Sequence, residues 1–250
     1  MATMTKNWDR HVGDAEEIAR LPGFQDLRDR ILDAADPQAD EVVIDIGAGT
    51  GLLSLALADR VHAVWAIDIS PSMLGYLDAK AESAEIANIR CAVACATSLP
   101  LVDASVDVAV SNYCFHHLDD AGKVRAIREA ARVLRPGGRL VFGDMMFRLG
   151  VGETRDREVI AAKARALASR GLPGMIRLAR NGLRVATGRW ERPAPAAWWT
   201  EQLRLAGFVG VGAEVLAHEG GVGWAQKPTS DTASAAGAAE VAILAGSPHD

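Results

Sequence analysis

The sequence predicts an α/β fold in which a mainly parallel sheet is covered by helices. Short apolar runs alternate with stretches of helical spacing, and glycine-rich turns separate them. A content of 49% hydrophobic and 24% charged residues is typical of a globular protein. Strands are expected at residues 41–46, 64–69, 89–94, 106–111 and 140–147, with helices at 52–60, 72–84 and 121–133.

Local signals place the ends of several elements. Ser70 is expected to be the N-cap of a helix, because its side chain can accept a hydrogen bond from a free backbone N–H of the first turn. Pro71 is expected to be the first residue of this helix, because proline has no backbone N–H that would need a partner there. The Pro-Gly-Gly of residues 136–138 is expected to turn the chain into the fifth strand. Near the N-terminus, Asp14 is expected to cap a helix over residues 15–19.

The alternation of strands and helices stops at residues 148–206, which have helical character and a net charge of +7. Strand character returns at 208–215 and 222–226, and the residues after 228 are rich in Ala, Ser, Thr and Gly, as in disordered tails. We therefore expect an N-terminal helical segment, a core, a basic helical cap, a final strand pair of the core and a disordered tail, at residues 1–39, 40–147, 148–206, 207–228 and 229–250.

Composition and charge argue against several classes of protein. A net charge of −5 does not fit a surface that coats nucleic acid, so no nucleic-acid partner is expected. No apolar run is long enough to span a membrane, and residues 1–10 lack the apolar region of a signal peptide. Three cysteines are too few for a disulfide framework, so we expect a cytoplasmic protein.

A zinc site made of Cys91, Cys95, His116 and His117 is conceivable from the residue types. These residues contain no compact Cys-x-x-Cys pair, however, so buried thiols and loop histidines are the better interpretation. No metal is expected.

A glycine-rich turn between the first strand and its helix predicts a nucleotide site. Gly47, Gly49 and Gly51 omit side chains where the backbone turns sharply and approaches a ligand. The helix that follows directs free backbone N–H groups at this turn. Asp68 ends the next strand, where a carboxylate can accept hydrogen bonds from both hydroxyls of a ribose.

Two kinds of cofactor fit such a turn. Dinucleotide-binding folds prefer Gly-x-Gly-x-x-Gly, with the pyrophosphate at the helix N-terminus. Here the spacing is Gly-x-Gly-x-Gly, and Asp45 precedes it, so the carboxylate would repel a pyrophosphate. The same carboxylate suits a ligand that carries an ammonium and a sulfonium, and S-adenosylmethionine is such a ligand.

Five segments together resemble the class I S-adenosylmethionine-dependent methyltransferases, in particular the group that acts on small molecules and quinones. They are Asp-x-Gly-x-Gly-x-Gly at 45–51 and the segments 66–74, 98–107, 112–118 and 134–140. The resemblance implies a Rossmann-like, doubly wound sheet of seven strands, mostly parallel with the last strand antiparallel. It implies methyl transfer from S-adenosylmethionine as the activity.

The resemblance also implies which residues hold the cofactor. Asp45 would help to hold its amino group, and Asp68 would bind its ribose hydroxyls. The other expected cofactor residues are Gly47 and Gly49 at the methionine part, Gly51 in the same turn, Ile69 and Met73 near the adenine, and Asn112 on the cofactor side of the fourth strand.

One position departs from the family's pattern. In the family an Asp commonly precedes an Ala-x-x-Leu-Pro stretch and binds the adenine amino group. Here Cys95 stands at that position, and a thiol is a much weaker acceptor. The backbone of Ala96 and the side chain of Thr97 are the two candidates for the missing contact.

The methyl acceptor is expected at the carboxyl ends of the fourth and fifth strands, since ligands of such sheets bind there. His116 is the candidate base or acceptor-positioning group, because an imidazole titrates near neutral pH, and Asp144 is the candidate that orients the acceptor. His117 is a second candidate base. The alternative interpretation is that both histidines pack the loop and that Asp144 binds nearby backbone N–H groups.

The basic segment is expected to cover this site and select the acceptor. Arg177, Arg180 and Arg184 share one face at helical spacing. This face either is merely solvated or attracts an acidic or lipidic acceptor or an anionic membrane surface. Three tryptophans of this segment either wall an apolar pocket or anchor the cap on the sheet: Trp190, Trp198 and Trp199. The family resemblance further implies that Trp8 and His11, near the N-terminus, reach over the same site.

The function predicted from these patterns is S-adenosylmethionine-dependent methyl transfer to an O, C or N atom of a small, largely apolar molecule. The sequence leaves open which molecule this is and whether the chain forms oligomers. Two alternatives are a non-catalytic S-adenosylmethionine-binding regulatory protein and a nicotinamide-dependent oxidoreductase. The glycine spacing and Asp45 argue against the oxidoreductase.

Overall fold

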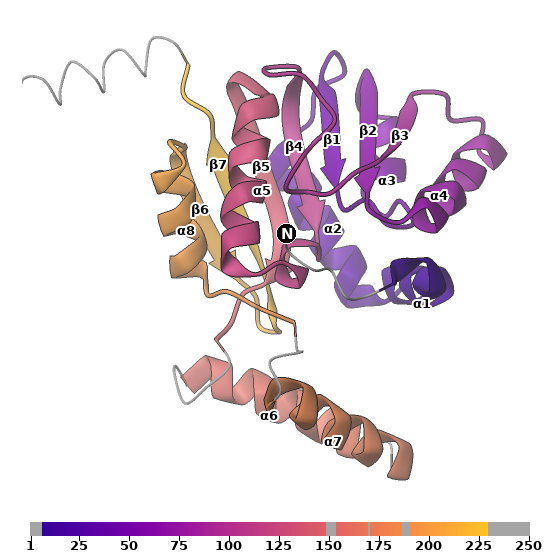
Figure 1. Cartoon of the computed structure of the whole chain (residues 1–250), viewed down its shortest axis with the longest axis vertical. Coiled ribbons are helices and arrows are strands. Elements are labelled where there is room, and N and C mark those ends of the chain that lie inside the picture. The colour runs from indigo at the N-terminus through magenta and orange to yellow at the C-terminus, as the bar shows by residue number, and fades with distance from the viewer. Residues whose placement is uncertain (1–6, 149–153, 170, 187–190, 230–250) are drawn as a thin grey trace, which may run out of the picture.

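The computed structural model describes residues 7–148, 154–169, 171–186 and 191–229, which contain a seven-stranded sheet (Figure 1). Strand β7 is antiparallel to both of its neighbours, and all other neighbouring strands are parallel. The predicted Rossmann-like sheet, mostly parallel with its last strand antiparallel, is confirmed. In spatial order the strands are β3 (Ile89–Val93), β2 (Ala63–Asp68), β1 (Val42–Ile46), β4 (Val106–Asn112), β5 (Leu134–Met145), β7 (Gly220–Gln226) and β6 (Val209–Val215).

Helices cover both faces of the sheet because its central strands are apolar on both sides. One face packs against α5 and α8, and the other against α2, α3 and α4. Two buried cores therefore flank the sheet. The bounds of these helices are Pro22–Ala35 for α2, Ser54–Ala58 for α3, Pro71–Ser83 for α4, Asp120–Val133 for α5 and Ala196–Leu205 for α8.

The order of the strands creates a switch point between β1 and β4. From β1 the chain proceeds outward to β2 and β3, and it then returns to the other side of β1 to continue through β4 and β5. Connections on the two sides of this point diverge, so the carboxyl ends of β1 and β4 leave room for a ligand between them. The glycine-rich turn follows β1, and Asn112 ends β4.

The first turns of two predicted helices differ from the structure. Helix α1 (Val12–Ala19) continues from a short 3-10 helix, η1 (Trp8–His11), so Asp14 lies in its first turn and is not its N-cap. The helix predicted at 52–60 is reduced to α3, because the turns that begin at the glycines continue through Leu53. The N-cap predicted for α4 is confirmed: Ser70 Oγ accepts a hydrogen bond from the backbone N–H of Met73 at 3.2 Å.

The turn predicted at residues 136–138 lies inside strand β5, which already begins at Leu134, and takes the form of a bulge: Val106 of β4 pairs with Leu134, but Val108 pairs with Arg139. The backbone N–H of Gly137 donates to the carbonyl of Lys227 at 3.0 Å, and the N–H of Lys227 donates to the carbonyl of Gly138 at 2.7 Å. These bonds hold the bulge, in which Gly137 has a positive φ of 81°, beside the end of β7.

Within residues 148–206, α6 (Thr154–Ala168) and α7 (Leu172–Ala186) form a hairpin below the sheet, on the side where the parallel strands end (Figure 1). Helix α8 instead packs on the sheet. Its Trp199 is buried, with its ring 4.7 Å from that of Phe142, so this tryptophan anchors the helix. Trp190 lies outside the described residues, and so does the tail predicted at residues 229–250 apart from its first residue.

The base of the hairpin is tied to the sheet through Arg155. Its guanidinium donates to the carbonyls of Leu216 and His218, at 2.9 and 2.8 Å, in the turn between β6 and β7. Among the described helices, none combines the length and apolar character that crossing a bilayer requires.

Candidate functional site

The glycine-rich turn folds back over the end of β2. The backbone N–H groups of Gly47 and Ala48 both donate to the carbonyl of Ile67, at 2.8 and 2.9 Å. Gly47 and Gly51 have positive φ angles, and a Cβ at either would collide with a neighbour: Cys114 Sγ at 2.4 Å for Gly47 and Leu77 Cδ1 at 2.3 Å for Gly51. These two glycines are therefore required by packing and by backbone conformation.

Gly49 differs from the other two glycines of the turn. Its φ angle is also positive, at 53°, but nothing lies within 4 Å of the place where a Cβ would stand. A ligand can therefore approach the backbone here without displacing protein atoms.

The carboxylate of Asp68 connects this turn to the next helix. One oxygen accepts from the backbone N–H of Gly49 and the other from that of Ser70, both at 2.9 Å. Burial raises the pKa of Asp68, while the two hydrogen bonds oppose that rise. A carboxylate has about four acceptor positions, so two remain for further donors.

Asp45 lies beneath the turn and is only 1% exposed. Its carboxylate accepts a hydrogen bond from Ser54 Oγ at 2.6 Å. Burial raises the pKa of the Asp45 carboxyl to about 7, against the effect of that hydrogen bond. The pKa of Asp45 therefore lies near neutral pH, where the charge of this carboxyl depends on what binds nearby.

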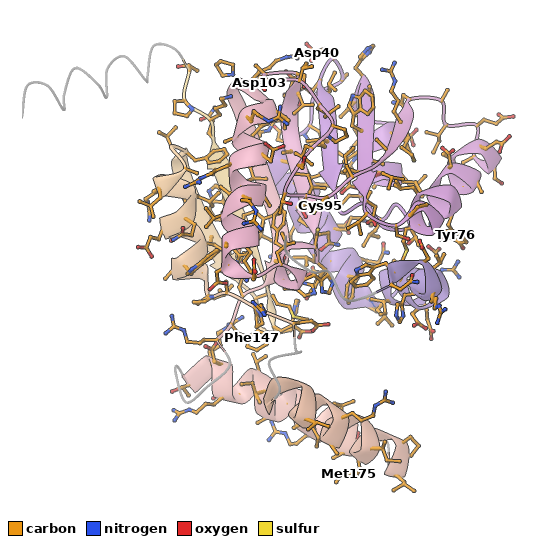
Figure 2. All side chains as sticks on the ribbon, in the orientation of Figure 1. Asp40, Tyr76, Cys95, Asp103, Phe147 and Met175 are labelled. Carbon is orange, nitrogen blue, oxygen red and sulfur yellow. The ribbon has the colours of Figure 1, made fainter. Side chains whose placement is uncertain are left out.

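The residues predicted near an adenine lie at the ends of β2 and β3. Ile69 is exposed, whereas the side chain of Met73, a residue of α4, is buried. Thr97 and Cys95 are half-buried, and their Oγ1 and Sγ atoms lie 3.2 Å apart. Figure 2 shows Cys95 near the middle of the molecule, whereas Asp40 and Asp103 lie at the top of the view, where strands β1 and β4 begin. Ala96, between Cys95 and Thr97, is also half-buried.

Asn112 ends β4 beside the glycine-rich turn. Its Oδ1 atom is buried and has no hydrogen-bond partner among the residues that the structure describes. The next residue, Tyr113, has a strained φ of 51°, and its N–H donates to the carbonyl of Gly143 at 2.8 Å. An unsatisfied buried acceptor next to a strained residue marks a place where a ligand can supply the missing donor.

His116 and Asp144 form a buried hydrogen-bonded pair at the ends of β4 and β5. His116 Nδ1 lies 2.6 Å from one oxygen of Asp144, which is fully buried. The backbone N–H groups of His116 and Met145 also donate to Asp144, at 3.1 and 2.6 Å. Because an ionised carboxylate only accepts, Nδ1 carries the hydrogen, and in the neutral form of the ring Nε2 has the lone pair.

A group of aromatic and ionisable residues surrounds this pair. The ring of His117 lies 3.9 Å from that of His116 and 4.5 Å from that of Trp8, measured between centroids. One potential ligand atom each from His116, His117 and Glu191 lie within 4.8 Å of one another, as in a metal site. Cys91 and Cys95 do not belong to this group, so the described residues do not assemble the conceivable zinc site.

Two contacts at this edge have no counterpart in the sequence patterns. Asp9 of η1 accepts from Ser70 Oγ at 2.5 Å and from the N–H of Ser72 at 3.2 Å, and the bond from Ser70 lowers the pKa of Asp9. The N–H of Arg192 donates to the carbonyl of His116 at 2.7 Å. The first contact joins residues about sixty positions apart, and only the capping signal at Ser70 marks either end.

Comparison with known proteins assigns the central part of the chain. Residues 43–138 match the profile of a methyltransferase domain. An uncharacterized methyltransferase of Geobacillus thermodenitrificans (strain NG80-2) is 34% identical over 145 residues, which cover 57% of this chain and 61% of that relative. The chain therefore spans about three fifths of that relative's length.

Residues 43–138 are therefore similar to methyltransferase domains, and we call this segment the methyltransferase domain after the profile that it matches. The 27-O-demethylrifamycin SV methyltransferase of Amycolatopsis mediterranei (strain S699) is 35% identical over 142 residues, or 56% of this chain and 49% of that enzyme. A solved S-adenosylmethionine-dependent methyltransferase from Aquifex aeolicus shares the fold, with a TM-score of 0.60 and 18% identity over 86% of this chain and 97% of that one. The methyltransferase domain contains the turn, Asp68, Asn112 and His116, whereas Asp144 follows it.

Gly51, which is crowded, and Gly49, which is open, predict different losses of stability on substitution by alanine. Gly51→Ala should lower the free energy of unfolding by about 3 kcal/mol, because it combines a positive φ with a collision against Leu77. Gly49→Ala meets no neighbour and should cost only about 1 kcal/mol. Urea denaturation of the ligand-free proteins measures both, and equal losses would contradict the packing described here.

Asp45 predicts a pH dependence of stability. Its pKa rises from 3.8 in the unfolded chain to about 7 in the folded protein, so folding is favoured by the protonated form. This contribution is fully present below about pH 4 and is lost as the pH rises through 7, at roughly 1.4 kcal/mol per pKa unit. The unfolding free energy of Asp45→Asn, compared with that of wild type, should therefore rise by a few kcal/mol between pH 4 and pH 8.

The control for this prediction is Asp33→Asn, which changes an exposed carboxyl of α2. The difference in unfolding free energy between this control and wild type should vary little over the same pH range. A pH-independent difference between Asp45→Asn and wild type would contradict the role assigned to burial.

Proposed function

We propose that the chain is an S-adenosylmethionine-dependent methyltransferase that transfers a methyl group to an O, C or N atom of a small, largely apolar molecule. The observation that carries this proposal is the arrangement around the switch point. A glycine turn open to a ligand, two acids and an unsatisfied amide oxygen lie at the ends of β1, β2 and β4, and a buried His–Asp pair lies at the ends of β4 and β5.

The residues at the switch point fit the chemistry of this cofactor. The two remaining acceptor positions of Asp68 suit the hydroxyls of a ribose. The orphaned Oδ1 of Asn112 suits an ammonium donor, and Asp45 adds negative charge for the ammonium and the sulfonium. Gly47 and Gly49 bring the backbone to the methionine part, with Gly51 shaping the turn.

The adenine side has a less complete set of contacts. We propose that exposed Ile69 covers the adenine and that Ala96 or Thr97 supplies the contact that Cys95 cannot make. The buried side chain of Met73 would act from below, by supporting the first turn of α4. Affinity for the adenine is thus expected to depend on apolar packing more than on a carboxylate.

The bound cofactor supplies an electrophilic methyl group on a positively charged sulfur. The chain's own task is to orient the acceptor and to receive its proton. We assign the proton to Nε2 of His116, because Asp144 holds Nδ1–H and stabilises the imidazolium that forms. Asp144 is thus a positioning residue that acts through His116.

The surroundings of His116 support an apolar acceptor. Trp8 packs against His117, and the ring of Tyr113 stacks on that of Phe24 at 4.7 Å. Aromatic side chains bind apolar molecules through large contact areas. The rifamycin methyltransferase relative is named for a small-molecule acceptor, which agrees with this class.

The two alternative functions are less consistent with these residues. A buried acid beneath the turn disfavours a nicotinamide dinucleotide, whose pyrophosphate would lie there. A regulatory S-adenosylmethionine-binding protein has no need of an oriented, buried His–Asp pair. We place the protein in the cytoplasm because its three cysteines are free thiols.

Asp68 tests the cofactor assignment. Asp68→Ala should weaken S-adenosylmethionine binding by roughly a hundredfold, since two hydrogen bonds to a charged acceptor are lost. Titration calorimetry measures the dissociation constant, with Asp78→Ala as the matched control, an exposed acid of the neighbouring helix. If Asp68→Ala binds the cofactor as tightly as the control does, the ribose assignment is wrong.

His116 tests the assignment of the proton acceptor. His116→Gln should lower kcat at least a hundredfold with a deprotonation-dependent acceptor, because general-base catalysis contributes about this much, while S-adenosylmethionine affinity stays unchanged. Asp144→Asn should lower kcat with little change in S-adenosylmethionine affinity, since a neutral amide lacks the negative charge that stabilises the imidazolium. Turnover that is unchanged in His116→Gln would leave His116 as loop packing, and loss of wild-type turnover on adding EDTA would point to a metal in its place.

A further inference from the structure

Helices α6 and α7 form a unit that stands apart from the sheet (Figure 1). In the part of the chain that the structure describes, α7 packs extensively against α6 alone. Figure 2 shows Met175 near the far end of this hairpin, away from the sheet, whereas Phe147 lies between the sheet and the hairpin. Most of the surface of α7 is therefore available to something other than the methyltransferase domain.

Helix α7 exposes an apolar stripe. Four of its large apolar side chains are 73%, 51%, 53% and 66% exposed: Leu172, Met175, Ile176 and Leu183. At 3.6 residues per turn they fall within an arc of about 100°. Isolated exposed apolar side chains are common, but an aligned set on one helix marks an interaction surface.

Positive charge accompanies this stripe. Arg180 is exposed and belongs to the same helix, and Arg157 and Arg165 are exposed on α6. The sequence places two further arginines, 177 and 184, in α7 at three positions before and four after Arg180. No acid occurs in residues 172–186, so the helix pairs an apolar stripe with positive charge only.

We propose that α7 docks on an anionic lipid surface. A helix with one apolar and one arginine-rich face lies in the plane of a membrane, with its apolar side chains among the acyl chains and its arginines at the phosphates. A second copy of the chain would match the apolar stripe but would bring like charges together. The uncompensated positive charge therefore favours a negatively charged bilayer.

This docking orients the whole molecule. The hairpin lies on the side of the sheet where the parallel strands end, the edge that bears His116 and Asp144 (Figure 1). A membrane-bound hairpin turns this edge towards the bilayer, where an apolar or lipidic acceptor is concentrated. This consequence rests on the proposed function, whereas the docking itself does not.

Vesicle sedimentation tests the docking with the full chain. Wild type should bind vesicles of equimolar phosphatidylcholine and phosphatidylglycerol, release at high salt and bind vesicles of phosphatidylcholine alone at least tenfold more weakly. Ile176→Asp and Met175→Asp should each weaken binding to the anionic vesicles more than tenfold, and Arg180→Glu about tenfold. Leu205→Asp, at an equally exposed leucine of α8, should bind as wild type does.

Three results would overturn the proposal: no binding of wild type to anionic vesicles, equal losses in Leu205→Asp and Ile176→Asp, or a dimer in light scattering that Ile176→Asp dissociates. Circular dichroism of each variant confirms that the helices are retained. Calorimetric titration of the same preparations with S-adenosylmethionine reports separately on the proposed function, so that a failure of one proposal is distinguishable from a failure of the other.

Discussion

The candidate site depends on one carboxylate that serves two loops at once. Asp68 receives the N–H of Gly49 after β1 and that of Ser70 at the start of α4, and so fixes the distance between the glycine turn and the next helix. Each bond satisfies a backbone donor that would otherwise point into the site unpaired. Two acceptor positions of the same side chain remain directed at the space where we place a ribose. Structure and proposed cofactor binding therefore meet at a single residue.

Three acids at the strand ends, two of them buried and one half-buried, illustrate how environment divides one chemical group into different roles. Asp68 receives two backbone donors and is partly open to a ligand. Asp45 has one hydroxyl partner and a pKa near 7, so its charge responds to a bound cation. Asp144 has two backbone donors and an imidazole, which makes it a fixed partner for His116. In the function we propose, Asp45 and Asp68 serve the cofactor, whereas Asp144 serves the acceptor through His116.

Sequence patterns predicted those parts of the fold that local signals determine. The sheet followed from the alternation of strands and helices together with the family resemblance, and the start of α4 followed from Ser70, since caps and turns act over a few residues. Contacts between distant segments left no such signal: Asp9 on Ser70, and Glu191 beside His116, depend on how the N-terminus and the cap return to the site. That residues 136–138 form a bulge within strand β5 was missed for the same reason, since Lys227 holds this bulge.

Calorimetric titration of the wild-type protein with S-adenosylmethionine, and separately with S-adenosylhomocysteine, tests the central claim most directly. The site described here predicts that both bind with one molecule per chain. Because a bound ammonium lowers the pKa of Asp45, S-adenosylmethionine should release protons near pH 7, visible as a heat that depends on the ionisation enthalpy of the buffer. A folded protein that binds neither compound would contradict the assignment of this site and leave only the fold and the family resemblance.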